Sequence, residues 1–161
     1  MIGWAETPVG WARVEIASET LLSLGFTGEA PGEAFREKLP KVLFQAVQTC
    51  FAGSSDLLEQ AMSGTPFQRK VWSVLSQIPR GEKWTYREVA EAVAGASHAR
   101  AVAQACSRNP IAFFIPCHRV VAANDIGGYR WGIEIKRSLL EWEGGGGDPR
   151  EFFRSFCRAN T

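Results

Sequence analysis

The sequence has few of the residues that build metal centres, disulfide frameworks or membrane spans. Its 161 residues include four cysteines and two histidines, and no two cysteines are spaced as C-x-x-C. This scarcity argues against a zinc site, and we expect no metal and no cofactor. No apolar run approaches the roughly 18 residues that cross a bilayer. The N-terminus lacks the basic and apolar regions of a signal peptide, so we expect a cytoplasmic protein with reduced cysteines and no membrane partner.

Net charge is also small, at +1, but the charges are unevenly distributed along the chain. Between Thr65 and Arg137 there are 11 Lys and Arg against 5 Asp and Glu, whereas the remainder carries 7 against 12. A basic middle segment weakly favours a polyanionic partner, although a solvated surface is the commoner meaning of such an imbalance.

Hydrophobic patterning predicts a small N-terminal part with a sheet and a helix. Alternation in WARVEIAS, followed by LLSLGF, predicts a β-hairpin. Apolar residues at helical spacing predict a helix from about Gly32 to Phe51, and the Gly- and Ser-containing stretch after it predicts a connection. We therefore expect an N-terminal domain over residues 1–60, a second domain over 64–144 and a tail over 145–161.

The second part is predicted to consist of short helices. One runs from Pro66 to about Pro79, and a second begins at the capping box TYRE, residues 85–88, and stops at Gly95. Ser97 is placed to cap a third helix, HARAVAQACSRN. The second and third helices together predict a helix-turn-helix.

The remaining sequence predicts one more long helix and a tail. A turn-prone NDIGG precedes a helix from about Ile133 to Glu143. The following glycines, 144–147, indicate a flexible linker rather than a phosphate loop, because no strand leads into them. Three aromatic residues would dock a short tail helix on the body: Phe152, Phe153 and Phe156.

The run FFIPCHRVV, residues 113–121, sets a cysteine beside a histidine. Free Cys belongs most often to apolar cores, and a Cys-His pair alone is a weak sign of catalysis. A thiol attacks as its thiolate, so Cys117 would need a base, and His118 is the candidate. Because neighbours in an extended chain point to opposite faces, we expect them to interact through a water, with an acid orienting the imidazole. The helix-turn-helix just upstream favours DNA as the substrate.

A longer stretch resembles a known family. RAVAQACSRNPIAFFIPCHRVVAANDIGGYRWGIEIKRSLLEWEG, with GTPFQRKVWSVLSQIPRGEKWTYREVA before it, is similar to the O6-alkylguanine-DNA alkyltransferases, also called methylated-DNA–protein-cysteine methyltransferases. The match covers about Gly64 to Gly144, and PCHRV in this setting is highly specific. The resemblance implies an α+β fold, in which a small sheet-and-helix domain, ribonuclease H-like in outline, precedes a mostly helical domain with a helix-turn-helix.

The resemblance implies a single-turnover repair protein. Cys117 would attack the alkyl carbon on guanine O6, or on O4 of methylthymine, and become a stable thioether. A water would link Cys117 to His118, and Glu143 would complete the relay. Asn109 matches the asparagine that braces the turn before the active-site segment. Tyr86 matches the tyrosine that assists base rotation and hydrogen-bonds guanine N3.

It also implies that duplex DNA containing O6-alkylguanine is the partner of a monomeric protein. The base would be flipped, and a slim helix would enter a minor groove about 6 Å wide. Arg100 would occupy the space left by the base, while Gln104, where some relatives have glycine, leaves the groove contact open. The slim face would comprise Ala99, Ala101, Ala103 and Ala105. The pocket would comprise the carbonyls of Cys117 and Val120, the N–H of Arg130, the ring of Tyr129 and, near the backbone, Lys136.

Two other functions stay open. A binding-only lesion sensor, similar to the alkyltransferase-like proteins, usually has tryptophan in place of the cysteine, so Cys117 favours repair. A helix-turn-helix transcription factor would prefer a DNA sequence to a lesion and would not need PCHRV. Of the remaining candidates, we expect Cys50, Cys106 and Cys157 to be core or surface thiols and His98 to be a capping or phosphate-contacting residue.

Overall fold

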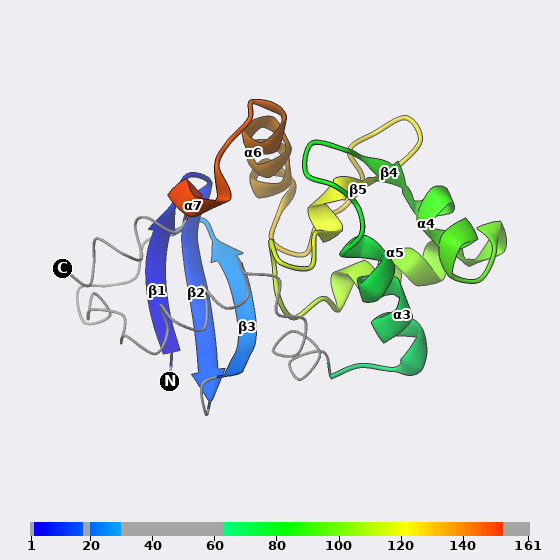
Figure 1. The fold of residues 1–161 in the computed structure, drawn as a ribbon, viewed down its shortest axis with the longest axis horizontal. Coiled ribbons are helices and arrows are strands. Elements are labelled where there is room, and N and C mark those ends of the chain that lie inside the picture. The colour runs from blue at the N-terminus through cyan, green and yellow to red at the C-terminus, as the bar shows by residue number, and fades with distance from the viewer. Residues whose placement is uncertain (1, 18–19, 30–62, 153–161) are drawn as a thin grey trace. The chain divides into compact units, whose positions relative to one another are not determined.

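The computed structural model describes residues 2–17, 20–29 and 63–152 (Figure 1). Several predictions lie outside these ranges: the helix at 32–51, most of the connection after it, Cys50, Cys157, Phe153 and Phe156.

The chain divides into two units, and its architecture is α+β, as predicted. One unit comprises Met1–Met62 together with Gly147–Thr161, and the other comprises Ser63–Gly146. Residues 147–152 of the predicted tail are grouped with the N-terminal unit. Among the described residues, no helix combines the length and apolar character that crossing a bilayer requires.

The first unit contains a three-stranded antiparallel sheet in the order β1-β2-β3. The predicted hairpin is confirmed as β2, Gly10–Ala17, paired with β3, Thr20–Thr27. Strand β1, Ile2–Thr7, pairs with β2 and was not predicted, because IGWAET carries no clear alternation. The inward side of β2 is apolar and buried, as period-two alternation requires.

A short helix at the C-terminal end of the described chain packs on this sheet. Helix α7 spans Pro149–Phe152. The ring of Phe152 is fully buried and meets the ring of Phe26 edge-on, with centroids 5.9 Å apart. The predicted docking of a tail helix through Phe152 is therefore confirmed.

In the second unit, two helices begin as the sequence predicts. Thr65 caps α3, Pro66–Leu75, in a capping box with Gln68. Thr85 caps α4, Tyr86–Val93, where its hydroxyl accepts from the Glu88 N–H at 3.1 Å and the Glu88 carboxylate accepts from the Thr85 N–H at 2.7 Å. Both helices bury one apolar stripe, and the indole of Trp72 on α3 donates to the Ala105 carbonyl on the third helix.

The third helix, α5, spans Ala99–Ser107 but does not begin as predicted. A 3₁₀ turn, η2, spans Ala96–His98, and no side chain caps it or α5. Neither Ser97 nor His98 is a capping residue, and the Ser97 hydroxyl instead lies 3.4 Å from His98 Nδ1. The bond from the His98 N–H to the Gly95 carbonyl closes the turn, so the backbone itself links α4 to α5.

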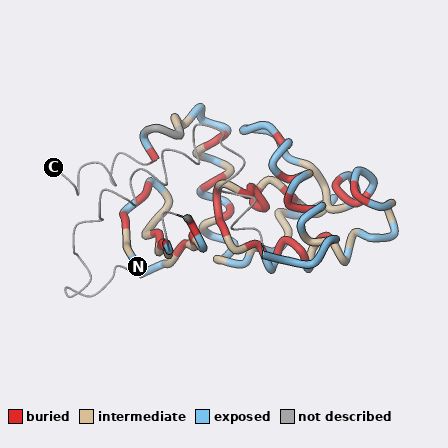
Figure 2. Tube along the Cα trace, turned by 60° about the horizontal axis from the view of Figure 1, so that its bottom comes forward, coloured by how far each residue is buried: buried red, intermediate tan, exposed pale blue. Residues whose placement is uncertain are grey.

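A short parallel ladder, which the sequence did not predict, joins distant parts of this unit. Strand β4, Trp84–Thr85, pairs with β5, Val120–Val121, so the start of α4 lies beside the segment that follows Cys117. Directly before β5 comes η3, a 3₁₀ turn at Cys117–Arg119. After β5 comes α6, Ile133–Gly144, close to its predicted bounds. Most residues from Asn109 to Val120 are buried, and Figure 2 shows the buried stretches of the chain in red.

Candidate active site

A tightly turned segment carries Cys117 from the end of α5 into the interior of the second unit. The N–H of Cys117 donates to the Ile115 carbonyl at 2.8 Å across Pro116, whose φ and ψ are −82° and 61°. These values are those of an inverse γ-turn, and the proline ring holds φ in the range that this turn needs. The proline in PCHRV therefore has a local structural role.

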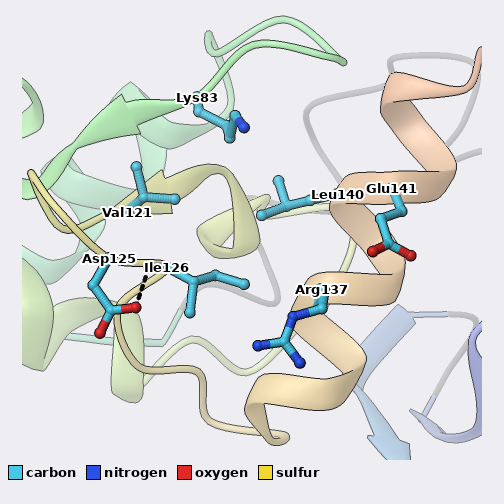
Figure 3. Close-up of a pocket in the computed structure, with 7 residues that line it drawn as sticks. All are labelled: Lys83, Val121, Asp125, Ile126, Arg137, Leu140 and Glu141. Atoms are coloured by element: carbon cyan, nitrogen blue, oxygen red, sulfur yellow. Dashed lines mark hydrogen bonds between the residues drawn. The ribbon is translucent and has the colours of Figure 1, made fainter.

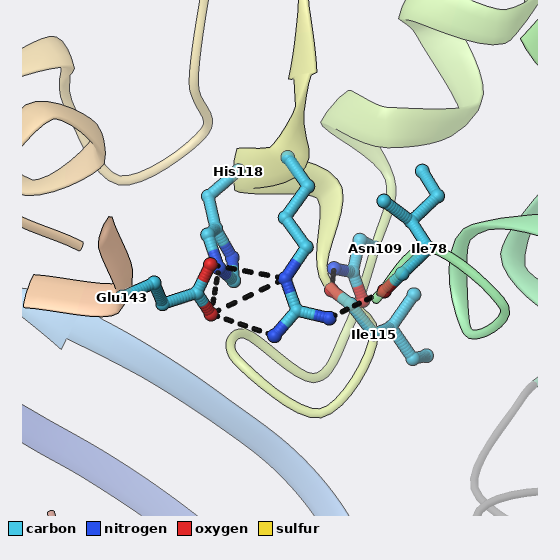
Figure 4. A network of polar contacts seen from close by, with 6 residues as sticks. Ile78, Asn109, Ile115, His118 and Glu143 are labelled. Atoms are coloured by element: carbon cyan, nitrogen blue, oxygen red, sulfur yellow. Dashed lines mark hydrogen bonds and ion pairs between the residues drawn. The ribbon is translucent and has the colours of Figure 1, made fainter. Parts of the chain in front are cut away.

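Asn109 braces this segment, as the family resemblance implies. Its carboxamide is fully buried and makes three bonds. Nδ2 donates to the Ile115 carbonyl at 2.8 Å (Figure 4) and to Cys117 Sγ at 3.2 Å, and Oδ1 accepts from the Ile111 N–H at 2.9 Å. Its own carbonyl accepts from Arg130 Nη1 at 2.6 Å. One side chain thus connects the end of the helix to the sulfur atom.

The Cys117 thiol is buried, with 3% of the residue exposed. Burial raises its pKa to about 11, while the hydrogen bond from Asn109 and the positive charges of Lys136 and Arg130 act in the opposite direction. At neutral pH the resting sulfur is protonated. A reaction at this sulfur must therefore hand the proton to a nearby base.

His118, next in the chain, belongs to a buried polar network (Figure 4). Its Nε2 lies 2.8 Å from Oε1 of Glu143 on α6. Arg119 holds the same carboxylate through Nε and Nη2, at 2.7 to 3.2 Å, and donates from Nη1 to the Ile78 carbonyl at 2.6 Å. The network ties η3 to α6 and to the end of the α3 region.

Electrostatics keep the imidazole neutral and the carboxylate ionised. Burial lowers the pKa of His118, the Glu143 carboxylate opposes that change, and the charges of Arg119 and Lys136 reinforce it. Burial alone would raise the pKa of Glu143, but the hydrogen bonds from His118 and Arg119 bring it down to about 2. Because a carboxylate only accepts, Nε2 carries the proton and Nδ1 is left as an acceptor. Within the described residues, the buried Nδ1 has no hydrogen-bond partner.

The expectation that Cys117 and His118 lie on an extended chain is wrong, because they lie on η3. Asn109 holds the sulfur and Glu143 holds the imidazole, so the two side chains take different partners. Arg119 is a residue that the sequence analysis left without a role. A charged side chain inside an otherwise apolar run was the signal, since burial of such a charge requires a partner.

The sulfur faces a pocket of about 330 Å³, within the usual size range of small-ligand sites of about 300–1,000 Å³. Residues from the start of α4, from α5, from η3 and from the loop after β5 line it: Tyr86, Ala103, Cys106, Ser107, Cys117, Gly128, Tyr129 and Arg130. Cys106 is buried, as expected of a packing residue, and it also forms part of the pocket wall.

Lys136 holds the loop that forms one wall. The residue is fully buried, and its ammonium donates to the carbonyls of Val120 at 2.6 Å and Gly128 at 2.9 Å. Burial lowers its pKa, against the effect of the neighbouring Cys117. The Val120 carbonyl, expected to accept from the guanine amine, accepts from Lys136 in this structure.

Tyr86 packs against the same loop. Its hydroxyl lies 3.4 Å from the Gly128 carbonyl, and burial raises its pKa to about 12. Gly127 has a φ of +75°, and a Cβ there would lie 3.0 Å from the Tyr86 ring. The sequence analysis interpreted NDIGG only as a turn and missed this close approach, which requires glycine.

The exposed face of α5 agrees in part with the predicted DNA-binding face. Arg100 and Gln104 are exposed, and Ala101 and Ala103 are half-buried. Ala105 is buried, however, and its carbonyl accepts from Trp72. Ala105 therefore belongs to the core, because it lies on the stripe that packs against α3.

A second pocket, of about 470 Å³, lies between β5, the following loop and α6 (Figure 3). Its lining is Lys83, Val121, Asp125, Ile126, Arg137, Leu140 and Glu141. Its lining contains no thiol and no imidazole, whereas the lining of the first pocket contains the Cys117 nucleophile.

Comparison with known proteins shows which family the chain resembles in sequence. Residues 66–145 match the family model described as 6-O-methylguanine DNA methyltransferase, DNA binding domain. A probable methylated-DNA–protein-cysteine methyltransferase of Acanthamoeba polyphaga mimivirus is 49% identical over 96 residues, 58% of this chain and 64% of the relative. A methylated-DNA–protein-cysteine methyltransferase of Saccharolobus islandicus is 33% identical over 144 residues, 88% of this chain and 94% of the relative.

A solved structure is similar over most of the chain. The crystal structure of Mycobacterium tuberculosis OGT in complex with DNA has a TM-score of 0.68 and 28% identity, covering 92% of this chain and 95% of the other. The chain spans between about half and two thirds of the length of the first curated relatives that it matches. The matched span includes Asn109, Cys117, His118 and Glu143.

Proposed function

Because the chain belongs to the 6-O-methylguanine DNA methyltransferase family, we propose that it repairs DNA by moving the alkyl group of O6-alkylguanine onto Cys117 in a single turnover. One observation carries the proposal. The Cys117 thiol faces a small-ligand pocket, held there by Asn109, next to a buried neutral imidazole that is oriented by Glu143. A buried cysteine with a purely structural role needs none of these partners.

The transfer is a displacement at the alkyl carbon. The sulfur of Cys117 attacks that carbon, a C–S bond forms, the C–O6 bond breaks, and its electron pair goes to the guanine. The thiol proton passes through a water to Nδ1 of His118, which is free to accept because Nε2–H is held by Glu143. The thioether that results is stable, so each protein acts once.

The leaving guanine needs a proton donor, and Tyr86 is positioned for it. Burial raises the pKa of Tyr86 to about 12, so the phenol keeps its proton at neutral pH. Its present bond to the Gly128 carbonyl is long, at 3.4 Å, and is readily exchanged for guanine N3. Lys136 holds the Val120 and Gly128 carbonyls in place at the edge of the site.

The substrate reaches the pocket as a base flipped out of duplex DNA. An alkyl group on a stacked base cannot reach a buried thiol, so rotation of the nucleotide is required. The exposure of Arg100 on α5 supports contact of this helix with the minor groove, with Arg100 filling the gap. The slim residues Ala101 and Ala103 let the helix approach the groove, and Tyr129 and Arg130 complete the pocket wall.

We place the protein in the cytoplasm as a monomer, consistent with the free thiols of Cys106 and Cys117.

A non-catalytic lesion sensor is the alternative, and it predicts tight binding without transfer. The test is the intact mass of the protein after incubation with a duplex that carries one O6-methylguanine, followed by peptide mapping. We expect one added methyl per chain, on Cys117, and restored guanine. Cys106→Ser is the matched control, because it removes the other thiol of the same pocket, and it should still be methylated. Lesion-selective binding with no change in mass would instead identify a sensor. A duplex with O4-methylthymine, run in parallel, tests the second substrate.

A further inference from the structure

Phe113, four residues before Cys117, has an unusual backbone conformation. Among the residues that the structure describes, it is the one non-glycine residue with positive φ, at 71°. The N–H of Phe114 donates to the Ala112 carbonyl at 2.8 Å, so Phe113 is the central residue of a γ-turn of the positive-φ type. Bulky residues avoid this region because their Cβ crowds the backbone, and such strain persists only where the surroundings impose it.

The strained turn places an aromatic ring against the His118–Glu143 pair. The Phe113 ring lies nearly parallel to the His118 imidazole, with an interplanar angle of 16° and centroids 6.3 Å apart. It also meets the ring of Trp142, which precedes Glu143 on α6, at 6.0 Å. Phe113 is 7% exposed and His118 is fully buried, so the two nearly parallel rings both lie in the interior of the unit.

We propose that Phe113 is a positioning residue for the relay: its ring fixes the plane of the His118 imidazole, with Nε2 toward Glu143 and Nδ1 available to the proton of Cys117. An imidazole without this support can rotate about its side-chain bonds and loses the orientation that one hydrogen bond alone fixes incompletely. The ring also keeps water from that face of the imidazole. On this proposal, the strained backbone of Phe113 serves to give the His118 imidazole a defined orientation.

The proposal concerns a residue for which neither the resemblance nor the polar network gives a role, and it rests on the proposed function for its kinetic consequence. Charged and titratable groups around the imidazole are Glu143 and Lys136 on α6, and Cys117 and Arg119 on η3. A change at Phe113 leaves all four in place. An altered pH dependence would therefore reflect lost cover and orientation rather than a lost charge.

Three variants test the proposal. Phe113→Gly removes the ring and accepts the positive φ without strain, and Phe113→Leu keeps apolar bulk without a flat face. Phe114→Leu is the matched control, because it makes the same change one residue along, where the ring meets Phe113 edge-on at 5.8 Å. The rate of alkyl transfer in a single turnover is measured from pH 5 to 8 for each, together with the NMR titration and tautomer of the His118 imidazole without DNA.

We expect Phe113→Gly to lower the plateau rate about tenfold, as partial loss of a general base would. We also expect its acid limb to move to higher pH, since a hydrated imidazole takes its proton more readily. Phe113→Leu should show the same changes to a smaller extent, and it keeps the test valid if the glycine variant does not fold. Phe114→Leu should keep the pH profile and tautomer of the unchanged protein.

Three results would overturn the proposal: unchanged profile and tautomer in both Phe113 variants, equal shifts in Phe114→Leu, or reduced stability without a shift. The imidazole titration needs no substrate. If the unchanged protein transfers no alkyl group, the proposed function fails, while the NMR result still decides whether Phe113 positions the ring.

Discussion

The helix pair α4–α5 and the segment around Cys117 are built in different ways. In the helix pair most of the bonds are local, as in the capping box of Thr85 and Glu88 or the backbone turn at Gly95, and Trp72 adds one distant bond to the Ala105 carbonyl. The segment from 109 to 121 is irregular, and distant side chains hold it: Lys136 and Glu143 from α6 bind it directly. Short-range bonds are enough for a surface that is proposed to contact DNA, whereas an atom that is proposed to react has to be held from several directions.

Buried polar residues are also distributed differently between the helix pair and the Cys117 segment. The described residues include five buried polar or charged ones, and four of them belong to the network around Cys117: Asn109, His118, Lys136 and Glu143. A buried polar group that loses its partner costs free energy. The Cys117 segment should therefore respond to single substitutions in both stability and chemistry, and the helix pair should respond mainly in stability or affinity.

Cys117→Ser should separate the two regions most completely. The hydroxyl is a far weaker nucleophile at neutral pH, so transfer should fall below detection, by more than about a thousandfold. Binding to a duplex with O6-methylguanine should stay within a few fold, because α5 is unchanged. Quantitative transfer and a binding titration on the same protein check both statements. A large loss of affinity would mean that the thiol segment also carries DNA binding.

Asn109→Ala removes three buried hydrogen bonds and loosens the turn that presents the sulfur. We expect a fall in transfer rate of about a hundredfold, since misplacement of a reacting group by about 1 Å has that effect. The free energy of unfolding should drop by about 3 kcal/mol. Arg108→Ala, one residue earlier and exposed, is the control and should change neither quantity by much. Equal rates in the two variants would contradict the bracing role.

Glu143→Gln should lower the plateau rate by about tenfold, because the carboxylate stabilises the imidazolium that forms as the thiol loses its proton. The carboxylate also raises the pKa of His118, against the effect of burial. Its loss should therefore move the acid limb of the pH–rate profile to lower pH. Single-turnover rates from pH 5 to 8 test both. A variant that transfers at the normal rate would remove Glu143 from the relay.

Acid should destabilise the Cys117 network in two stages. The pKa of His118 is lowered on folding, so the unfolded chain binds a proton that the folded one refuses, and stability falls below about pH 6.5. The pKa of Glu143 is lowered to about 2, so its contribution is present above pH 5 and lost as pH falls toward 2, on the order of 3 kcal/mol. Denaturant unfolding between pH 7 and 3 should show a flatter lower stage in Glu143→Gln.

Thr85→Ala, in the helix pair, should have the smallest effect. It removes the hydroxyl that caps α4, which is worth about 1 kcal/mol of stability. Thermal unfolding should report that loss, while the rate of transfer at saturating protein changes by less than about twofold. A larger kinetic effect would mean that β4 and the cap also hold Tyr86 in position, and the contrast between the regions would be less sharp.

The Phe67 ring and His98 illustrate what local pattern leaves out. The sequence predicted α3 from Thr65 and Pro66, and α4 from TYRE, because caps and stripes act over a few residues. His98, expected to cap the helix or to contact phosphate, does not cap it, and its ring lies near the Phe67 ring with centroids 6.2 Å apart. The 3₁₀ turn that stands in place of a side-chain cap depends on the conformation of Gly95, whose φ is 124°. Short sequence motifs do not determine that conformation.

By itself, the sequence predicted Cys117 as the candidate nucleophile, His118 as its candidate base and the starts of the surrounding helices, because these depend on residue identity and on short spacings. The family resemblance added Glu143 as the candidate acid and Asn109 as the bracing residue. Only the tertiary structure decided that Arg119 and His118 bind the same Glu143 carboxylate and that Lys136 donates to two carbonyls. It also decided that Gly127 lies too close to the Tyr86 ring for a side chain and that β4 pairs with β5. Each of these contacts joins residues that are separated in the chain or held in an irregular turn, where hydrogen-bond geometry in the folded interior, and not local propensity, selects the conformation.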